Sequence, residues 1–342
     1  MLHRNMIKNF IISIATVLCL TGLILFIFRD NLSEIHASLQ RLSGLHVLCL
    51  AGAGICYQLL DALAQYLLIR SIVPSFRYRQ AVEISYLGVF GQVALFSAGS
   101  FPLQAVYLHH HGIEVGHTIG LKTLNYAVHK ASVVLFATVM LLIGRGWLFD
   151  AVDGLRGYLI AGYLICLTII VTLLLLCTWS KAHGAAVWLL EKLPDRGRWA
   201  PAVRRIRHQL DGMYEETAAC MKKGKILLPV MAADFLKLGV FCAIPCLCTA
   251  MLGDPTVGIL QAEVLTGLML LISGAVPNVA GLGPIELTFY LLYKPFLGEI
   301  PGSSALLLFR IATYYFPFAV SSAVFVILQG KLLSAKKSGE GM

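Results

Sequence analysis

The sequence carries very little charge for its length. Of its 342 residues only 13% are Asp, Glu, Lys or Arg, whereas 58% are hydrophobic. A soluble domain has too little interior to bury that much apolar surface, so this composition excludes a water-soluble fold. It predicts instead a protein whose chain crosses a membrane several times.

Several familiar patterns are also missing. The nine cysteines show neither disulfide nor metal-ligand spacing, and Cys242, Cys246 and Cys248 lie in an apolar run, where they are expected to pack as small side chains. The chain has no nucleotide-binding loop. No base-stacking aromatic residues are interleaved with the basic ones. We therefore expect no metal, no cofactor and no nucleic-acid partner.

Long apolar runs, by contrast, are abundant. A membrane-spanning helix needs about 20 mostly apolar residues. The clear candidates are residues 10–28, 45–69, 119–143, 158–179, 226–251 and 304–330. The first run follows a basic N-terminus but precedes no small-residue cleavage site, which favours a retained helix over a signal peptide. Two more apolar segments, 81–98 and 258–297, are interrupted by proline, glycine and polar residues.

The basic residues predict the orientation. Ten Lys and Arg lie in the connection 180–225, and both termini are basic as well. Such an excess is typical of cytoplasmic segments. If 81–98 crossed fully, this connection would lie outside. A hairpin over 81–108 that enters and leaves at the cytoplasmic face places the connection and both termini inside, with 258–297 forming a second hairpin, or two short crossings, at the opposite face.

We therefore predict an all-α polytopic protein of the cytoplasmic (inner) membrane with six full spans and two re-entrant helical hairpins. The order helix, helix, hairpin, helix occurs twice with opposite orientation, a pattern that recurs in transporters. It predicts one integral membrane domain, 1–342, with inverted halves at 10–143 and 158–330, joined in part by the basic loop. The sequences AGSFPLQ (98–104) and AGLGPIE (280–286) support this repeat.

Each interruption predicts a hairpin tip within the membrane. The expected tip residues are Gly99, Pro102, Pro277, Gly281, Gly283 and Pro284. Irregular backbone at this depth is tolerated only where protein buries it or where it lines a wet cavity. The N–H groups that begin the next half-helix attract anions. Two opposed tips around a polar site are therefore predicted, and two proline-kinked helices without a site are the alternative.

Five intramembrane polar residues are the candidate substrate-binding groups. They are Glu286, Arg310, Lys130, Gln104 and Asn278. A membrane-embedded ionisable residue is costly and usually faces a cavity or a partner, and the planar fork of Arg310 suits a phosphate. An ion pair of Glu286 with Arg310 that only holds the hairpin is the structural alternative. Lys130 can instead snorkel, and the two amides can cap the interrupted helices.

Other polar residues have weaker assignments. Asp234 and Lys237 lie three residues apart on one helix and are expected to neutralise each other. Asp61 and Glu263 have no partner nearby in the sequence, so either is a candidate proton site. Consecutive histidines at 109–111 point in different directions on a helix, which argues against one shared metal and favours an interfacial cluster.

The basic connection contains an amphipathic stretch at 201–222. Its apolar residues recur at helical spacing, opposite a basic face. That face consists of Arg204, Arg205 and Arg207. On the inner leaflet each basic residue contributes about 1 kcal/mol of attraction to anionic lipid. Membrane lipids, in particular anionic phospholipids, are therefore the expected partners, and a solvated loop is the alternative.

Three motifs resemble a known family. FPLQAVYLHHHGI (101–113), PNVAGLGPIELTF (277–289) and FRIATYYFP (309–317) are similar, in this order, to signature segments of the flippase-like family that is also named after the transmembrane region of lysylphosphatidylglycerol synthetases. The resemblance covers residues 10–330. It implies an integral membrane protein that moves or handles lipids.

The resemblance leaves three functions open. We expect a flippase-like transporter for a phospholipid or another phosphate-bearing lipid. A membrane enzyme of lipid or polyprenyl-carrier metabolism and a membrane partner of a soluble synthase are the alternatives. Bifunctional relatives carry a soluble domain that charges phosphatidylglycerol with lysine. Because this sequence ends twelve residues after its last expected helix, that transferase activity is not expected here.

Overall fold

The computed structural model describes most of the chain after residue 39. Described are residues 40, 42–94, 100–113, 115–151, 156–192, 226–253, 255–274 and 282–339, with single residues between 203 and 215. The expected first helix at 10–28 lies outside these residues. So do Gly99, Pro277, Asn278 and Gly281 of the expected tips and site.

The elements of the described ranges are helices. They are α3 (Gly44–Arg70), α4 (Tyr78–Ala94), α5 (Ser100–His110), α6 (Val115–Ala151), α7 (Arg156–Thr178), α8 (Ser180–Glu191), α10 (Leu227–Met251), α11 (Ile259–Ser273), α12 (Pro284–Leu297), α13 (Glu299–Arg310), the π-helical turn η3 (Ile311–Tyr315) and α14 (Phe316–Gly339). Four stretches are long and apolar enough to cross a membrane, namely Gly44–Arg70, Leu124–Leu148, Leu227–Met251 and Glu299–Gln329.

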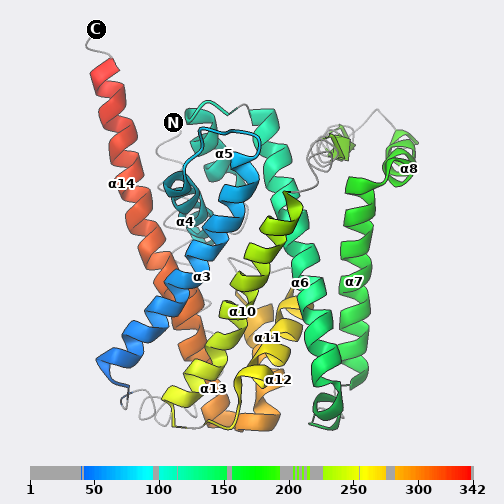
Figure 1. Ribbon diagram of the computed structural model, residues 1–342, viewed down its shortest axis with the longest axis vertical. Helices are drawn as coiled ribbons and strands as arrows, with labels where there is room; N and C mark the ends of the chain where they lie inside the picture. Colours follow the sequence, from blue (N-terminus) through cyan, green and yellow to red (C-terminus); the bar gives the residue numbers. More distant parts are fainter. Residues whose placement is uncertain are drawn as a thin grey trace.

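Both interrupted segments form pairs of short helices. In Figure 1, α4 and α5 lie near the end of the molecule where α3 ends and α6 begins, whereas α11 and α12 lie towards the opposite end. The longest of the four, α4, has 17 residues. At 1.5 Å per residue it is about 26 Å long, short of the roughly 30 Å of a bilayer's hydrocarbon core. A single helix of either pair therefore does not cross the core if it stands upright.

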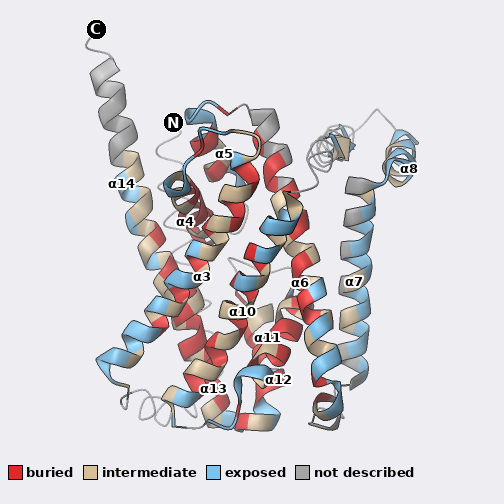
Figure 2. Cartoon of the chain, in the orientation of Figure 1, coloured by how far each residue is buried: buried red, intermediate tan, exposed pale blue. Residues whose placement is uncertain are grey.

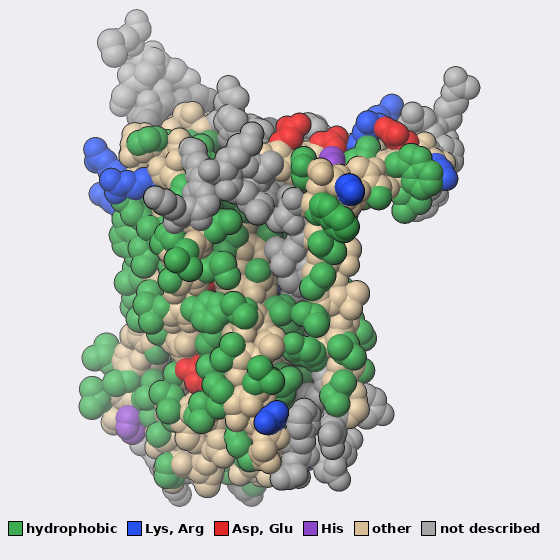
Figure 3. Space-filling model, turned by 45° about the vertical axis from the view of Figure 1, so that its right-hand side comes forward, with side chains coloured by type: hydrophobic (Ala, Val, Ile, Leu, Met, Phe, Trp, Pro, Cys, Tyr) green, Lys and Arg blue, Asp and Glu red, His purple; other side chains and the backbone are tan. Residues whose placement is uncertain are grey.

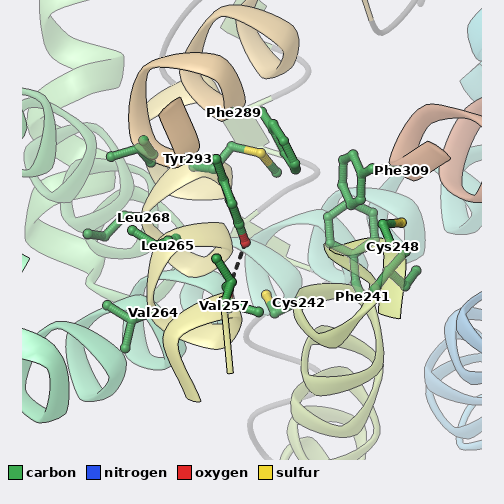
Figure 4. Packing of buried hydrophobic residues seen from close by; sticks show 14 of the residues in the cluster. Phe241, Cys242, Cys248, Val257, Val264, Leu265, Leu268, Phe289, Tyr293 and Phe309 are labelled. Carbon is green, nitrogen blue, oxygen red and sulfur yellow. Dashed lines mark hydrogen bonds between the residues drawn. The ribbon is translucent and has the colours of Figure 1, made fainter. Parts of the chain in front are cut away.

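Helix α10 lies at the centre of the bundle. It packs against α3, α6, α11 and α13, and Figure 2 shows buried residues concentrated on these inner helices while α7 and α8 are largely exposed. Figure 4 shows the aromatic part of this core, in which Phe289 stacks on Tyr293 with ring centroids 4.2 Å apart. Phe309 of α13 stacks on Phe289 in turn. This packing fixes α13 against α12 immediately before Arg310.

The outer surface is apolar over the middle of the molecule. Figure 3 shows a broad band of hydrophobic side chains, with Lys and Arg gathered mainly near one end. On α7, for example, Leu164 and Ile165 are more than half exposed. An exposed apolar surface of this extent is expected where lipid replaces water as the solvent.

A close helix crossing depends on Gly54 of α3. A Cβ atom at this position would lie 2.3 Å from the carbonyl oxygen of Ala312 in the η3 turn. Gly54→Ala is therefore expected to lower the free energy of unfolding by about 1–3 kcal/mol, the usual cost of overpacking. Thermal unfolding in detergent measures this loss.

Gly52 provides the matched control, because a Cβ atom there meets nothing within 4 Å. Gly52→Ala removes only the flexibility of glycine within a helix and is expected to stabilise the protein by about 0.5–1 kcal/mol. Equal shifts of the unfolding temperature in both variants would show that the crossing at Ala312 has no energetic importance.

Candidate functional site

A polar cavity of about 290 Å³ lies among α3, α4, α5, α10, α11, α12, α13 and η3. Both interrupted helix pairs contribute to it, Gln104 from α5 and Ile285 from α12. Its polar lining consists of Tyr57, Gln58, Asp61, Ser85, Gln92, Ser100, Gln104, Arg310, Thr313 and Tyr314. A cavity lined by so many polar groups, inside a bundle with an apolar exterior, is the strongest candidate for a binding site in the described part of the chain.

Glu286 and Arg310 form a buried ion pair next to this cavity. The exposed fractions of the two residues are 7% and 5%. Arg310 donates from Nε to Glu286 Oε1 over 2.7 Å, and its Nη2 contacts the same oxygen. Arg310 lines the cavity, whereas Glu286 is not among the described lining residues. The structure thus contains the expected pair, with the guanidinium on the cavity side.

Glu286 also begins helix α12. Its Oε2 accepts a hydrogen bond from the backbone N–H of Gly283 over 2.7 Å, which satisfies one of the N–H groups left open at a helix start. Gly283 has φ = 104°, a conformation that favours glycine, and Pro284 follows as the first residue of the helix. The turn therefore fixes the carboxylate that holds Arg310.

Gln104 joins the two helices of the first pair. Its Nε2 donates to the carbonyl oxygen of Ile84 on α4 over 3.0 Å. Gly88 makes room for this contact, since a Cβ atom there would lie 2.2 Å from Gln104 Nε2. Pro102 lies in the first turn of α5, where an N–H group has no partner within the helix, so its missing N–H costs no hydrogen bond.

Lys130 lies on α6, outside the described lining of the cavity. It is half-buried, with its ammonium group 5.5 Å from the ring centroid of Tyr126. Of the four residues of the expected cleft, Arg310 and Gln104 line the cavity, and Glu286 is bonded to Arg310.

Asp61, one of the two candidate proton sites in the sequence, is the acidic residue of the described lining. Its Oδ1 lies 3.1 Å from the ammonium group of Lys237, which comes from α10. Lys237 Nζ also lies 2.5 Å from Asp234 Oδ1 and 3.2 Å from His129 Nδ1. Asp234 and Lys237 are therefore paired, as expected, but Lys237 is shared with two further helices.

Amide and hydroxyl groups complete this network. Asp61 Oδ2 accepts hydrogen bonds from Gln65 Nε2 and from Ser85 Oγ, each over 2.7 Å. Lys122 Nζ donates to Gln65 Oε1 over 2.5 Å. We refer to Asp61, Gln65, Lys122, His129, Asp234 and Lys237 as the charge cluster. In the sequence, the charge cluster was indicated only by charged residues within apolar runs, because a charge inside the membrane needs a partner.

The other polar candidates lie apart from the cavity. His109, His110 and His111 are exposed and line a surface groove of about 950 Å³ together with Arg77 and Arg79. Within the described ranges no group of three or more His, Cys, Asp or Glu residues is placed to hold a metal ion.

The amphipathic stretch at 201–222 is described only in part. Arg204 and Arg207 are exposed, and Arg205 lies outside the described residues. Arg207 Nη2 lies 2.9 Å from Glu191 Oε1. Part of the basic charge expected to face lipid is therefore paired within the protein.

The apolar exterior, the four long helices and the polar cavity among the helices define a class, the polytopic α-helical membrane proteins with an internal polar site. The particular family follows from comparison with known proteins. Residues 10–321 match the family model described as the lysylphosphatidylglycerol synthase TM region. The match covers nearly the whole chain, so the protein belongs to this family and has a membrane function related to lipids. No curated protein and no solved structure matches the chain.

Proposed function

We propose that the protein moves a phospholipid, or another lipid with a phosphate-bearing headgroup, across the cytoplasmic membrane. The observation that carries this proposal is Arg310, a buried guanidinium on the wall of a polar cavity that both interrupted helix pairs reach. Arginine presents a planar fork of donors that matches phosphate oxygens. Membership of a lipid-related membrane family supports a lipid as the carrier of that phosphate.

The size of the cavity favours a headgroup over a whole lipid. Its volume of about 290 Å³ is near the lower end of the roughly 300–1,000 Å³ typical of small-molecule sites. We infer that the headgroup enters the protein while the acyl chains stay in the bilayer. The apolar chains then never leave an apolar solvent, and only the polar headgroup needs a path.

Glu286 gives this path a resting state. Without lipid, Arg310 donates a hydrogen bond to the carboxylate of Glu286, so the buried guanidinium has an anion beside it. A headgroup phosphate that reaches the cavity exchanges with the carboxylate, and the carboxylate returns when the phosphate leaves. Each state keeps the guanidinium of Arg310 paired with an anion, so Arg310 itself is never the uncompensated buried charge that costs several kcal/mol.

The topology proposed for this movement has two re-entrant hairpins that enter from opposite faces. The pairs α4–α5 and α11–α12 would be these hairpins, in inverted halves at 10–143 and 158–330. Alternate exposure of the cavity to the two faces follows if one half rocks against the other. Both termini and the loop 180–225 then lie in the cytoplasm, where the remaining basic residues face anionic lipid.

A membrane enzyme is the weaker candidate. Acid–base catalysis by Glu286 needs a second group that exchanges protons within hydrogen-bond reach. The described partners of its carboxylate are the guanidinium of Arg310 and the backbone N–H of Gly283, and neither exchanges protons readily. We therefore propose a transporter without a catalytic residue.

Lipid movement in proteoliposomes tests the proposal. Headgroup-labelled phosphatidylglycerol is expected to exchange between leaflets faster with wild-type protein than in empty vesicles. Glu286→Gln is expected to slow this exchange by about 10–100-fold. The substitution removes a charged hydrogen bond of about 1.5–3 kcal/mol, so Arg310 no longer has a carboxylate that exchanges with the headgroup phosphate.

Glu299→Gln is the matched control. Glu299 is an acid at the start of α13 whose side chain is 55% exposed and pairs with Lys294, so the substitution should leave exchange unchanged. If wild-type protein moves the label no faster than empty vesicles, the phospholipid proposal is wrong.

A further inference from the structure

The charge cluster lies directly beside the proposed transport cavity. Its members come from α3, α6 and α10, and Ser85 of α4 is bonded to it. Asp61 belongs both to the cluster and to the cavity wall. We propose that this cluster binds and releases a proton, and that the proton couples lipid movement to a proton gradient. The coupling rests on the proposed transport function, whereas the proton binding does not.

The cluster has a sealed centre and accessible ends. The side chains of Lys237 and Asp234 are 3% and 1% exposed. Asp61, which also lines the cavity, is 24% exposed, and His129 is 30% exposed. The side chains on either side of Lys237 therefore leave part of their surface uncovered while the centre of the cluster is buried, which is the arrangement that a proton site needs.

The charges of the cluster balance when both of its lysines are protonated. Two carboxylates, Asp61 and Asp234, face the ammonium group of Lys237, and Lys122 joins the cluster through its hydrogen bond to Gln65. The sum is then zero while the imidazole of His129 is neutral. Since net charge is costly in a low-dielectric interior, one added or lost proton changes the stability of the whole arrangement. Protonation is therefore a strong signal at this site.

Two groups are placed to take that proton. His129 Nδ1 lies 3.5 Å from Asp234 Oδ1, and histidine is the side chain that ordinarily titrates between about pH 5 and about pH 8. Asp234 Oδ2 has no hydrogen-bond partner among the described residues although its side chain is buried. An open acceptor on a sealed carboxylate is where an added proton forms an O–H bond.

Other titratable groups nearby do not compete for this role. Tyr57 of α3 interacts electrostatically with Lys237 and Asp61, and Arg310 lines the same cavity as Asp61. Tyrosine and arginine titrate far above neutral pH. A metal cation is disfavoured as the ligand, because the ammonium of Lys237, at 3.1 and 2.5 Å from the two carboxylates, already occupies the position between them.

Protonation of Asp234 changes the ion pairs of Lys237. The proton comes from water through His129 and neutralises Asp234, so Lys237 keeps Asp61 as its one charged carboxylate. Asp61 also binds Ser85 of α4 and lines the cavity. One proton thus alters the charge next to the cavity wall and the ion pairs that join α3 and α10. The proton returns to water on the other side when the headgroup leaves.

A pH gradient across proteoliposomes tests the coupling. With headgroup-labelled phosphatidylglycerol, a gradient of about one pH unit is expected to change the leaflet distribution with wild-type protein by up to about tenfold. Asp234→Asn and His129→Gln are expected to abolish the change while exchange at symmetric pH continues. Glu263→Gln is the matched control, because Glu263 is a half-buried acid of α11 outside the cluster that also has an oxygen without a described partner.

The outcomes separate the two proposals. If wild-type protein exchanges lipid but the gradient changes neither rate nor distribution, the coupling is wrong and the transport proposal stands. If Glu263→Gln, but not the cluster variants, abolishes the gradient effect, the proton site is wrongly assigned.

Proton binding has its own measurement, which needs no lipid movement. The infrared difference spectrum of purified wild-type protein between about pH 8 and about pH 5 is expected to contain a carboxylic-acid band that Asp234→Asn removes and Glu263→Gln keeps. A wild-type spectrum without such a band overturns the assignment to Asp234 even if the transport proposal fails too. Should Asp234→Asn not fold, His129→Gln is expected to weaken the same band.

Discussion

Arg310→Met is expected to lower the free energy of unfolding by about 3–5 kcal/mol, because it leaves the carboxylate of Glu286 buried without its guanidinium. The pair is 5–7% exposed and Arg310 donates over 2.7 Å, so little water is available to replace the lost partner. Chemical or thermal unfolding in detergent measures the loss.

The double variant Glu286→Gln/Arg310→Met separates stability from transport. Replacing both charges of a buried pair by neutral side chains is often nearly neutral, so the double variant should regain most of the stability that Arg310→Met loses. Lipid exchange should stay abolished in both, since neither has a guanidinium for the phosphate. A double variant that regains exchange together with stability would show that Arg310 serves only to hold α12.

Lys237→Met is expected to cost at least as much, about 3–5 kcal/mol, and to reduce the yield of folded protein. Lys237 is the cation between Asp61 and Asp234, at 3.1 and 2.5 Å. Without it, the buried carboxylate of Asp234 and the half-buried carboxylate of Asp61 lose the ammonium group they share, and Lys122 is the lysine left in the cluster. The unfolding temperature and the folded yield in detergent measure the effect.

Lys294→Met is the control for this substitution. Lys294 pairs with Glu299 over 3.4 Å, but both side chains are about half exposed, and exposed pairs contribute little. Its stability should stay within about 0.5 kcal/mol of wild type. If Lys237→Met is as stable as Lys294→Met, the charge cluster does not hold α3 to α10, and its carboxylates must be neutral in the folded protein.

The long helices were predictable because their signal is local. The expected spans at 45–69 and 226–251 agree with α3 and α10 to within a residue or two, since the length of an apolar run and its polar flanks mark where a helix meets the membrane surface. The expected span at 119–143 lies within α6, whose stretch suited to crossing a membrane is Leu124–Leu148. The whole helix covers Val115–Ala151, because a helix can continue past the hydrocarbon layer without an apolar sequence.

The site was predictable only where a residue interrupted an apolar run. Glu286 and Arg310 stood out in this way, and the structure pairs them. The link of Asp61 to Lys237 joins residues 176 positions apart, so it depends on how α3 crosses α10 and has no trace in spacing. The π-helical turn after Arg310 was equally hidden, and so was the close approach of Gly54 to Ala312 within it.

The pairing of Glu286 with Arg310 also determines how a membrane voltage acts on transport. A voltage does electrical work of about 2.3 kcal/mol per 100 mV on each elementary charge that crosses. A paired carboxylate and guanidinium has no net charge, so its own movement within the bundle requires almost none of this work. The electrical work then depends on the charge of the headgroup together with that of the proton carried with it. An anionic headgroup that moves with one proton would cross almost independently of voltage, whereas a zwitterionic headgroup that moves with one proton would be driven towards the negative side, so the voltage alone would sort lipids between the leaflets.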